Sequence, residues 1–277
     1  CRSQTLRTPP GMEAHSRRTL SERLATPLFL GWQIFVRDFR ARYRRAMLSL
    51  IWVLAPMVMI AGTAYVVARE LDLEMLDKGV PYPVTLIAGL LLWGVFSEAV
   101  SGPQQMCRRS RTFLRKAPID YGAILVGATG YVVLNFLIKL PILIGVMVWF
   151  GIVPTLEALL VLPLLVALWL LGLSLGALVA PLSLVYFDVR YGLPFVLILL
   201  LVLTPVLYPP PEAGLLQVIT QYNPLAHLIV AARDLLLTGN STFELAAFTS
   251  AAGVLLLLAP LALLYYYRGM PKGVVHI

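Results

Sequence analysis

The charged residues that could do chemistry in this sequence lie in apolar surroundings. Glu98 and Lys139 are the only charges that fall within, rather than at the edge of, the apolar segments long enough to cross a membrane. An ionised group inside a membrane is costly, and it usually faces a partner or a water-filled path. We therefore expect either an ion pair between Glu98 and Lys139 or two residues that line a pathway. For Glu98 the alternative is a position close enough to the membrane surface for its carboxylate to reach water.

A row of arginines beside aromatic residues is the second feature that could bind a ligand. Five apolar residues of segment 32–45 fall three or four positions apart, so a helix would place them on one stripe. These residues are Trp32, Phe35, Val36, Phe39 and Tyr43. Arg37, Arg40 and Arg44 take the other side. Such a helix lies flat in a membrane surface, with its aromatic side chains down and its guanidinium groups toward lipid phosphates.

No pattern in the sequence is typical of an enzyme. The three histidines, His15, His227 and His276, lack the spacing of metal ligands. The phosphate-binding pattern G-x-x-x-x-G-K-[ST] is absent, and no Ser/His/Asp or Cys/His arrangement is suggested. The only dense group of acids resembles a solvated loop and consists of Glu70, Asp72, Glu74 and Asp77. We therefore predict no catalytic residue, no metal site and no cofactor in this chain.

The composition is that of a chain that crosses a membrane several times. Hydrophobic residues make up 59% of the chain and charged residues 13%, with a mean hydropathy of +0.84, whereas soluble domains are less apolar. Cys1 and Cys107 are too few for a disulfide framework. Residues 1–23 are polar and basic, so no cleavable signal peptide is visible. Cys1 stands where an initiator methionine is expected, which indicates numbering that begins inside a longer or processed chain.

We predict an all-α integral membrane protein with six spans. An amphipathic interface helix precedes the first span, and short re-entrant or surface helices precede the last. Segment 47–68 is uncharged, and as a helix it is about as long as the 30 Å core of a bilayer. Asn223-Pro224 interrupts an apolar stretch and predicts a helix start, with Asn as the cap and Pro in the first turn.

The predicted segments begin with a tail, residues 1–27, and continue with a membrane domain, residues 28–277. The domain contains an interface helix (30–45), six spans (47–68, 84–102, 121–150, 157–185, 192–208 and 245–267), a basic loop (103–118) and outer helices (212–237). Both termini are predicted on the inner side because basic residues concentrate there. The inner segments hold 18 of the 22 Lys and Arg residues, and an even number of spans keeps both basic ends on one side.

The basic loop 103–118 has two interpretations. It is either an anchor on anionic lipid, which positively charged inner loops commonly are, or a docking helix for a soluble partner. Met106, Phe113 and Leu114 lie among arginines, and a short amphipathic helix formed by them could enter a groove of that partner.

Four stretches of the sequence, in this order, carry a family resemblance. They are RDFRARYRRAMLSLIWVLAPM (37–57), YPVTLIAGLLLWGVFSEAV (82–100), FDVRYGLPFVLILLLVLTPVLYP (187–209) and YNPLAHLIVAARDLLL (222–237). Together they resemble the permease subunit of ABC-2 type exporters of bacterial surface polysaccharide, namely O-antigen, teichoic-acid and capsule exporters. The third stretch is the most specific, since it is similar to the family's Asp-Val-Arg-Tyr turn before span five.

The resemblance implies a homodimer in the bacterial inner membrane that works with two copies of a separate ATPase subunit, which would bind ATP and Mg²⁺. It implies that the loop after span two holds a coupling helix and that the N-terminal helix also meets the ATPase. The implied coupling residues are Arg109, Arg111, Phe113, Leu114, Asp188 and Arg190. Tyr222, Asn223 and Pro224 would belong to an outer gate. We expect membrane lipids as further partners, and no nucleic acid.

The substrate implied by the resemblance is a polyprenyl-pyrophosphate- or lipid-linked glycan, drawn through a channel between two copies. Arg37, Arg40 and Arg44 would then guide the pyrophosphate. The channel-lining candidates are Trp52, Trp93, Phe96, Glu98 and Lys139. For the aromatic candidates the alternative is the belt at the membrane interface. The Asp-Val-Arg-Tyr motif favours O-antigen or teichoic-acid exporters over the capsule branch.

One stretch departs from the family's pattern. RRSRTFLRKAPID, residues 108–120, is more basic than in many members, so coupling contacts cannot be transferred residue by residue. Two other functions are open: a drug or small-lipid exporter of the same superfamily, and a membrane glycosyltransferase or independent channel. An enzyme would need paired acids at a membrane face. A neighbouring gene for an ATPase would separate these classes.

Overall fold

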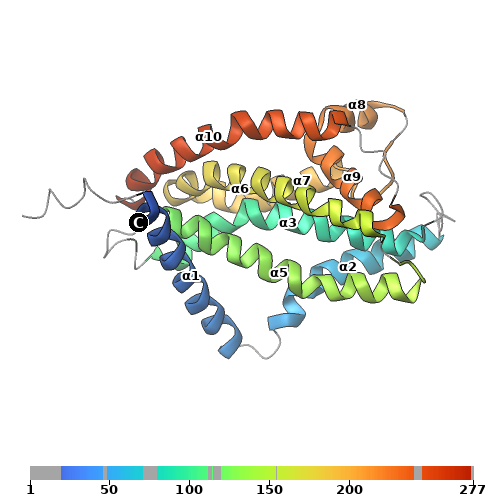
Figure 1. Cartoon of the computed structure of the whole chain (residues 1–277), viewed down its shortest axis with the longest axis horizontal. Helices are drawn as coiled ribbons and strands as arrows, with labels where there is room; N and C mark the ends of the chain where they lie inside the picture. Colours follow the sequence, from blue (N-terminus) through green and yellow to red (C-terminus); the bar gives the residue numbers. More distant parts are fainter. Residues whose placement is uncertain are drawn as a thin grey trace, which may run out of the picture.

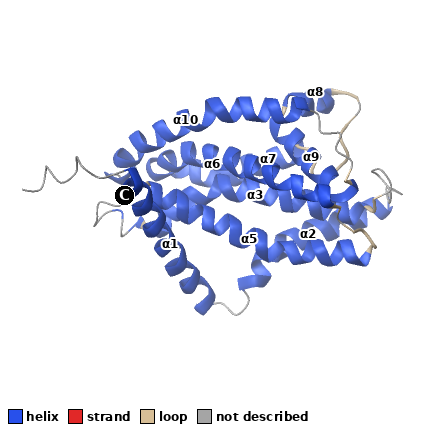
Figure 2. Cartoon of the chain, viewed as in Figure 1, coloured by secondary structure: helices blue, strands red, loops and turns tan. Residues whose placement is uncertain are grey.

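The computed structural model describes most of the chain as helices. The described residues are 20–45, 49–70, 80–111, 114, 120–153, 155–211, 213–239 and 245–275, and they contain helices and no strand element (Figure 2). The helices are α1 (Leu20–Arg45), α2 (Ser49–Glu70), α3 (Tyr82–Arg109), α5 (Gly122–Trp149), the 3-10 helix η2 (Leu156–Leu160), α6 (Val161–Val185), α7 (Phe187–Leu203), α8 (Leu215–Tyr222), α9 (Pro224–Thr238) and α10 (Leu245–Val275).

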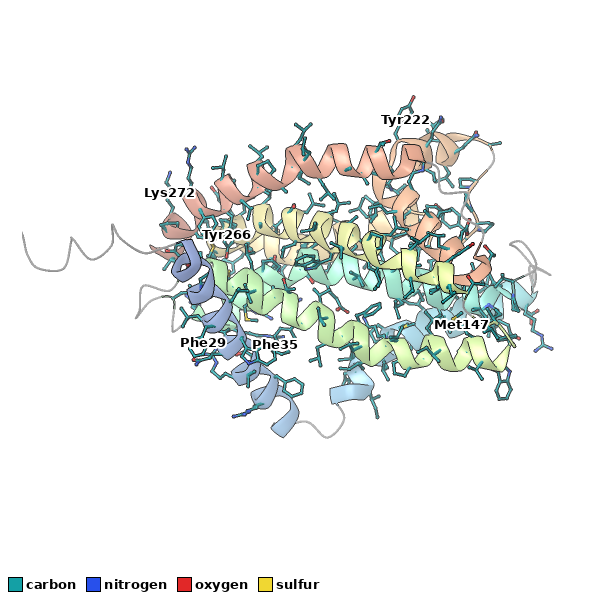
Figure 3. All side chains as sticks on the ribbon, in the orientation of Figure 1. Phe29, Phe35, Met147, Tyr222, Tyr266 and Lys272 are labelled. Atoms are coloured by element: carbon teal, nitrogen blue, oxygen red, sulfur yellow. The ribbon has the colours of Figure 1, made fainter. Side chains whose placement is uncertain are left out.

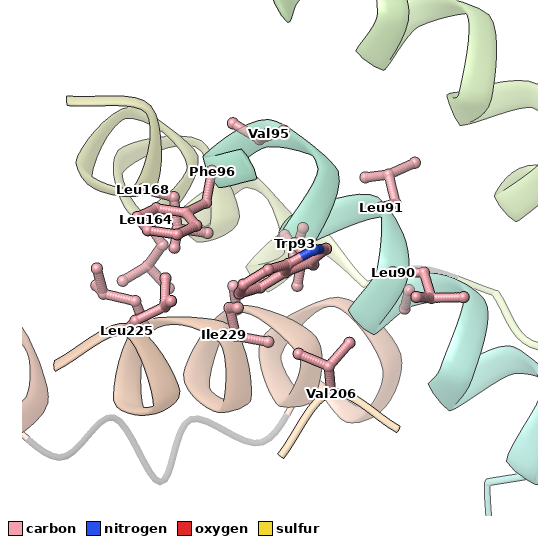
Figure 4. Close-up of a cluster of buried hydrophobic side chains, with 14 of the residues drawn as sticks. Leu90, Leu91, Trp93, Val95, Phe96, Leu164, Leu168, Val206, Leu225 and Ile229 are labelled. Atoms are coloured by element: carbon pink, nitrogen blue, oxygen red, sulfur yellow. The ribbon is translucent and has the colours of Figure 1, made fainter. Parts of the chain in front are cut away.

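The helix α3 is the centre of the structure. It packs against α5 and α6 along its length and also meets α2, α7 and α9 (Figure 1). Its sequence is apolar on every side between Val84 and Phe96, so burial on all sides removes the most apolar surface. Trp93 and Phe96 form the middle of this core, against Ile229 of α9 and Leu168 of α6 (Figure 4).

Small residues let α6 approach α3 closely. A Cβ added at Gly172 would lie 2.5 Å from the carbonyl oxygen of Phe96, and one at Gly176 would lie 2.6 Å from that of Val100. Two small residues four positions apart are a common way for helices to pack in membranes, where van der Waals contact replaces the hydrophobic effect as the source of attraction.

The helix α1 packs against α5 through one side of its predicted aromatic stripe. Phe35 is 9% exposed and lies edge-to-face on Tyr131 of α5, with 5.4 Å between the ring centroids. Gly130 makes room for the Phe35 ring, since a Cβ there would lie 2.8 Å from it. Trp32, on the same stripe, is 61% exposed. The stripe therefore faces the protein at Phe35, and the expectation that the whole stripe faces lipid is wrong.

Within the described residues, four helical segments are long and apolar enough to cross a membrane, as in a multi-pass integral membrane protein. They are α3, α5, Leu156–Val185 and Ala251–Val274. The apolar part of α2, Ile51–Val67, and the 17-residue α7 are shorter. These two helices correspond to the first and fifth predicted spans.

Several predicted boundaries differ from those of the helices, and in two cases the helix continues through a proline. The basic loop was expected to begin at Pro103, but α3 continues through this buried proline to Arg109. The interface helix was expected at residue 30, but α1 begins at Leu20 and contains Pro27. Helices that cross membranes tolerate proline because neighbouring groups satisfy the freed carbonyls. The fifth span was expected at 192–208 with the Asp-Val-Arg-Tyr motif as a turn before it, but α7 begins at Phe187 and includes this motif.

The two short helices before the last span are confirmed as α8 and α9. Asn223 is the cap of α9, because its side-chain oxygen accepts a hydrogen bond from the backbone N–H of Leu225 at 3.1 Å. Pro224 occupies the first turn, where its missing N–H has no cost. The helix ends before Gly239, whose φ of 65° is the left-handed conformation that glycine adopts readily. The helix-start signature therefore gave the correct local structure.

We expect Gly172→Ala and Gly176→Ala each to destabilise the protein by about 1–3 kcal/mol, because the new methyl group would collide with backbone of α3. The measurement is the melting temperature of the purified protein in detergent. Gly145→Ala in α5 is the control, since nothing lies within 4 Å of a Cβ there. Unchanged melting temperatures in both α6 variants would show that the α3–α6 contact is looser than described.

Candidate functional site

An ion pair between Glu98 and Lys139 joins α3 to α5. The Lys139 Nζ donates a hydrogen bond to Glu98 Oε1, and the two side chains are 12% and 24% exposed, respectively. Gly94, one turn before Glu98, leaves space for the ammonium group, since a Cβ there would lie 3.2 Å from Nζ. The ion pair, one of the two predicted arrangements, is confirmed. Removing either partner would leave a charge with no compensation in an apolar region.

A polar face of α3 continues from this pair toward the basic end. Ser101, Gln105 and Arg109 follow Glu98 at intervals of three or four residues, so they lie on one face of the helix. They line a small cavity of about 50 Å³ together with Tyr131 and Asn135 of α5. A polar cavity of this size has room for a few water molecules. The ion pair therefore has a polar route toward one end of the protein.

The far end of this route touches α1. The Arg109 guanidinium lies over the ring of Tyr131, 4.9 Å from its centroid, and the same ring packs on Phe35 of α1. A cation over an aromatic face is attracted by the ring quadrupole. Arg109 of α3 thus contacts α5 directly, and α1 is reached through the Tyr131 ring.

The basic ends of several helices gather at one end of the molecule. Figure 3 shows Lys272, Tyr266, Phe29 and Phe35 together at this end, and Met147 and Tyr222 at the other. Of the predicted coupling residues, Arg111 and Asp188 are exposed, and the guanidinium of Arg190 lies 5.4 Å from the ring centroid of Tyr191.

Two coupling candidates do not fit the prediction of an exposed docking face. Leu114 is 7% exposed and packs in the cluster of Phe35 and Tyr266, so it is not available to enter a partner's groove. Met106 is 1% exposed for the same reason. Phe113 lies outside the described residues.

The arginine row of α1 is only partly available to a ligand. The Nη2 of Arg37 donates to Asp38 Oδ1 at 3.0 Å, and its Nε donates to the same oxygen at 3.3 Å. Arg40 is exposed. Arg44 belongs to α1, and its side chain is outside the description. Since an acid already compensates Arg37, Arg40 is the better described candidate for an anion contact.

The aromatic channel candidates separate into two kinds. Trp93 is 8% exposed and Phe96 is 1% exposed, and the two rings pack on each other with centroids 5.4 Å apart (Figure 4). Their assignment to a channel lining is wrong for this subunit, because both side chains fill its core. Trp52 on α2 is 74% exposed, so its side chain lies on the surface of this subunit.

The irregular segment after α7 is held by three side chains, and sequence reasoning missed two of them, Tyr82 and Arg233. Tyr82 of α3 donates its hydroxyl to the carbonyl oxygen of Leu207, and Arg233 of α9 donates from Nη1 to that of Pro205 at 3.3 Å. Asn223 also donates from Nδ2 to Thr204 Oγ1 at 3.2 Å. Among the outer-gate candidates, Asn223 thus fixes the segment, while Tyr222 is 80% exposed.

Arg233 is 1% exposed, and its burial could have been predicted. It follows Ile229 by four residues and Leu225 by eight, so it falls on the apolar stripe of α9. A charge on an apolar stripe indicates a buried polar partner. Here the backbone carbonyl of Pro205 is one such partner.

Comparison with known proteins gives one family. The family model described as ABC-2 type transporter matches residues 30–237. Two O-antigen export system permease proteins RfbA of Klebsiella pneumoniae are each 24% identical to this chain over 233 residues. The matches cover 82% of this chain and 87% of each relative. They therefore extend over nearly all of both sequences rather than over one motif.

We expect Glu98→Gln and Lys139→Gln, as single changes, to destabilise the protein by about 3–5 kcal/mol, because each leaves a partly buried charge without its partner. The double variant should recover most of this loss, since two neutral amides can still form a hydrogen bond. Melting temperature and the yield of folded protein are the measurements. Asp188→Asn, at an exposed carboxylate, is the control. A double variant no more stable than either single one would contradict the coupling.

Proposed function

Because this chain belongs to the ABC-2 type transporter family, we propose that it is the permease subunit of an ATP-driven exporter of a lipid-linked cell-surface polysaccharide. Membership of this family confirms that the subunit is a non-catalytic membrane part of a transporter. Such permeases typically bind no cofactor, so ATP and Mg²⁺ belong to a partner ATPase. The observation that supports the polysaccharide substrate is the similarity to O-antigen export permeases along 82% of the chain.

The proposed arrangement has six spans in the bacterial inner membrane. The helices α2 and α7 are the two spans that we add to the four longer ones. The 17 residues of α7 extend over about 25 Å as a helix. Both termini lie on the cytoplasmic side, with residues 1–27 as a tail before the membrane domain 28–277. The excess of basic residues in the inner segments supports this orientation.

The proposed assembly is a homodimer with two copies of the ATPase. The ATPase meets the basic end of the subunit, where the exposed Arg111 and Asp188 are accessible and Arg109 and Arg190 stack on aromatic rings. Phe113 stays a candidate for this contact. Leu114, the next residue, is buried in the cluster of Phe35 and Tyr266. Tyr222, Asn223 and Pro224 form part of the outer gate.

The proposed substrate carries a pyrophosphate on a polyprenyl chain. Arg40 and Arg44, one turn apart on α1, guide the pyrophosphate toward a channel between the two copies, with Arg37 continuing the row. Arg suits this role because its planar fork binds phosphate oxygens in pairs. An O-antigen-like or teichoic-acid-like glycan is the proposed cargo, and Trp52 is the exposed aromatic residue that could contact sugar rings.

The function is tested by deleting the gene and analysing lipid-linked glycan, together with co-purification of the candidate ATPase. The expected result is glycan that accumulates on its lipid carrier inside the cell, with loss of the surface polymer. An unchanged glycan, with altered resistance to a drug or altered lipid distribution, would favour a drug or small-lipid exporter. Failure to find any ATPase partner would contradict the transporter assignment.

The topology is tested with single-cysteine variants at Asp77 and Arg111 in a background without other cysteines. We expect Asp77→Cys to react with a membrane-impermeant reagent in intact cells, and Arg111→Cys to react only after permeabilisation. Labelling of both positions from outside would contradict the six-span arrangement.

The pyrophosphate role is tested with the double variant Arg40→Lys/Arg44→Lys. Lys keeps the charge but loses the fork, so we expect export to fall clearly, and to fall further with Ala at both positions. The measurements are the export rate, the protein level and the basal ATPase activity of the complex. Full export with Lys at both positions would leave these arginines as a lipid anchor, because surface attraction is about 1 kcal/mol for either cation. Loss of ATPase pairing would indicate a partner contact instead.

A further inference from the structure

A groove at the basic end, between α6 and α10, has two different kinds of wall. Its volume is about 530 Å³, roughly ten times that of the cavity beside Glu98. Apolar side chains line one part and two cations the other: Leu182 and Val185 of α6, and Leu261, Leu264, Arg268 and Lys272 of α10. None of the described residues in the lining is acidic. Such a surface matches a ligand that has an anionic head and an apolar chain.

The order of these residues along α10 matches the polarity of a lipid. Leu261, Leu264, Arg268 and Lys272 follow one another at intervals of three or four residues, so they share one face of the helix. The apolar positions come first and the cations last. Residues 245–267 carry no charge, and Arg268 and Lys272 are the first charges after them, so we expect both cations where the helix leaves the membrane.

The two cations are free to bind an anion. Arg268 and Lys272 are exposed, and within the described ranges neither has an ion-pair or hydrogen-bond partner. They lie one helical turn apart, and at that spacing two side chains reach one phosphate group. The acid nearest in sequence to the groove residues of α6 is Asp188, two residues after Tyr186, and the described residues show no ion pair between it and either cation.

The shape of the groove is set by close backbone packing. A Cβ at Gly269 would lie 2.9 Å from the Pro181 side chain, and one at Gly273 would lie 3.2 Å from that of Leu184. These two glycines hold the ends of α6 and α10 together at the floor of the groove. The backbones that carry the groove's side chains are therefore held close together before any ligand binds.

We propose that this groove binds an anionic phospholipid of the inner leaflet, with its phosphate between Arg268 and Lys272 and one acyl chain along Leu261 and Leu264. These leucines are 61% and 57% exposed, so the chain would cover apolar surface that opens to the bilayer. A free phosphate would use only the cations. The proposal rests on the membrane location of the chain and not on the exported substrate, so its failure would leave the proposed function intact.

The test uses the permease purified in detergent, with phosphatidylglycerol and phosphatidylcholine of equal chain length as probes and native mass spectrometry as the readout. We expect phosphatidylglycerol to be retained selectively. Arg268→Gln and Lys272→Gln should each weaken its retention roughly fivefold, and the double variant more than tenfold. Arg108→Gln is the matched control, because Arg108 is an exposed cation at the same end but outside the groove.

Two further measurements distinguish other occupants. Leu264→Gln should weaken the binding of phosphatidylglycerol and leave the binding of glycerol phosphate unchanged. Equal effects on the binding of both would contradict an acyl-chain contact. Undecaprenyl phosphate should compete no better than phosphatidylglycerol, and stronger competition would assign the groove to a polyprenyl carrier. Equal retention of both phospholipids by the parent protein, or no loss in the double variant with an unchanged melting temperature, would overturn the proposal.

Discussion

Neither Glu98 nor Lys139 is stable as an isolated charge inside a membrane, so the contact between them constrains how α3 and α5 can meet. The pair fixes the relative height of the two helices, and Gly94 supplies the space that the ammonium group needs. From this point a polar face runs along α3 to Arg109, whose guanidinium lies over Tyr131. Because Tyr131 also packs on Phe35, the position of α1 depends on the same seam between α3 and α5.

The opposite end of the structure meets a different constraint. Between α7 and α8 the backbone is irregular, and its carbonyl groups need donors because apolar surroundings supply no water. Tyr82 and Arg233 donate to two of these carbonyls, and Asn223 both caps α9 and holds Thr204. This requirement gives a physical reason for a fully buried arginine in an apolar core. Polar side chains here stabilise backbone, whereas at the basic end they remain accessible to partners.

Sequence reasoning predicted the features that depend on local chemistry and missed those that depend on packing. The cap at Asn223 and the pairing of Glu98 with Lys139 follow from hydrogen-bond and charge requirements, and the residue types alone are enough to recognise these requirements. The surroundings of Trp93 and Trp52 do not follow, since a helix that is apolar on all sides carries no periodicity to separate its core face from its lipid face. One tryptophan is in the core and the other is exposed. The loop predicted to begin at Pro103 is helical as far as Arg109, because packing in the core holds α3 together through this proline.

The continuity of α3 through Pro103 changes how a signal from the basic end would reach the membrane interior. A flexible loop at residues 103–109 would absorb movement before it reached the core. As a helix, the segment from Glu98 to Arg109 is about 16 Å of continuous helical backbone. Gly176 of α6 packs directly against this segment, at Val100 and Pro103, so sliding α3 there also moves α6. The contacts of this segment with α5 and α6 thus give a direct structural connection between Arg109 and the ion pair, and the small cavity beside Glu98 leaves room next to the pair.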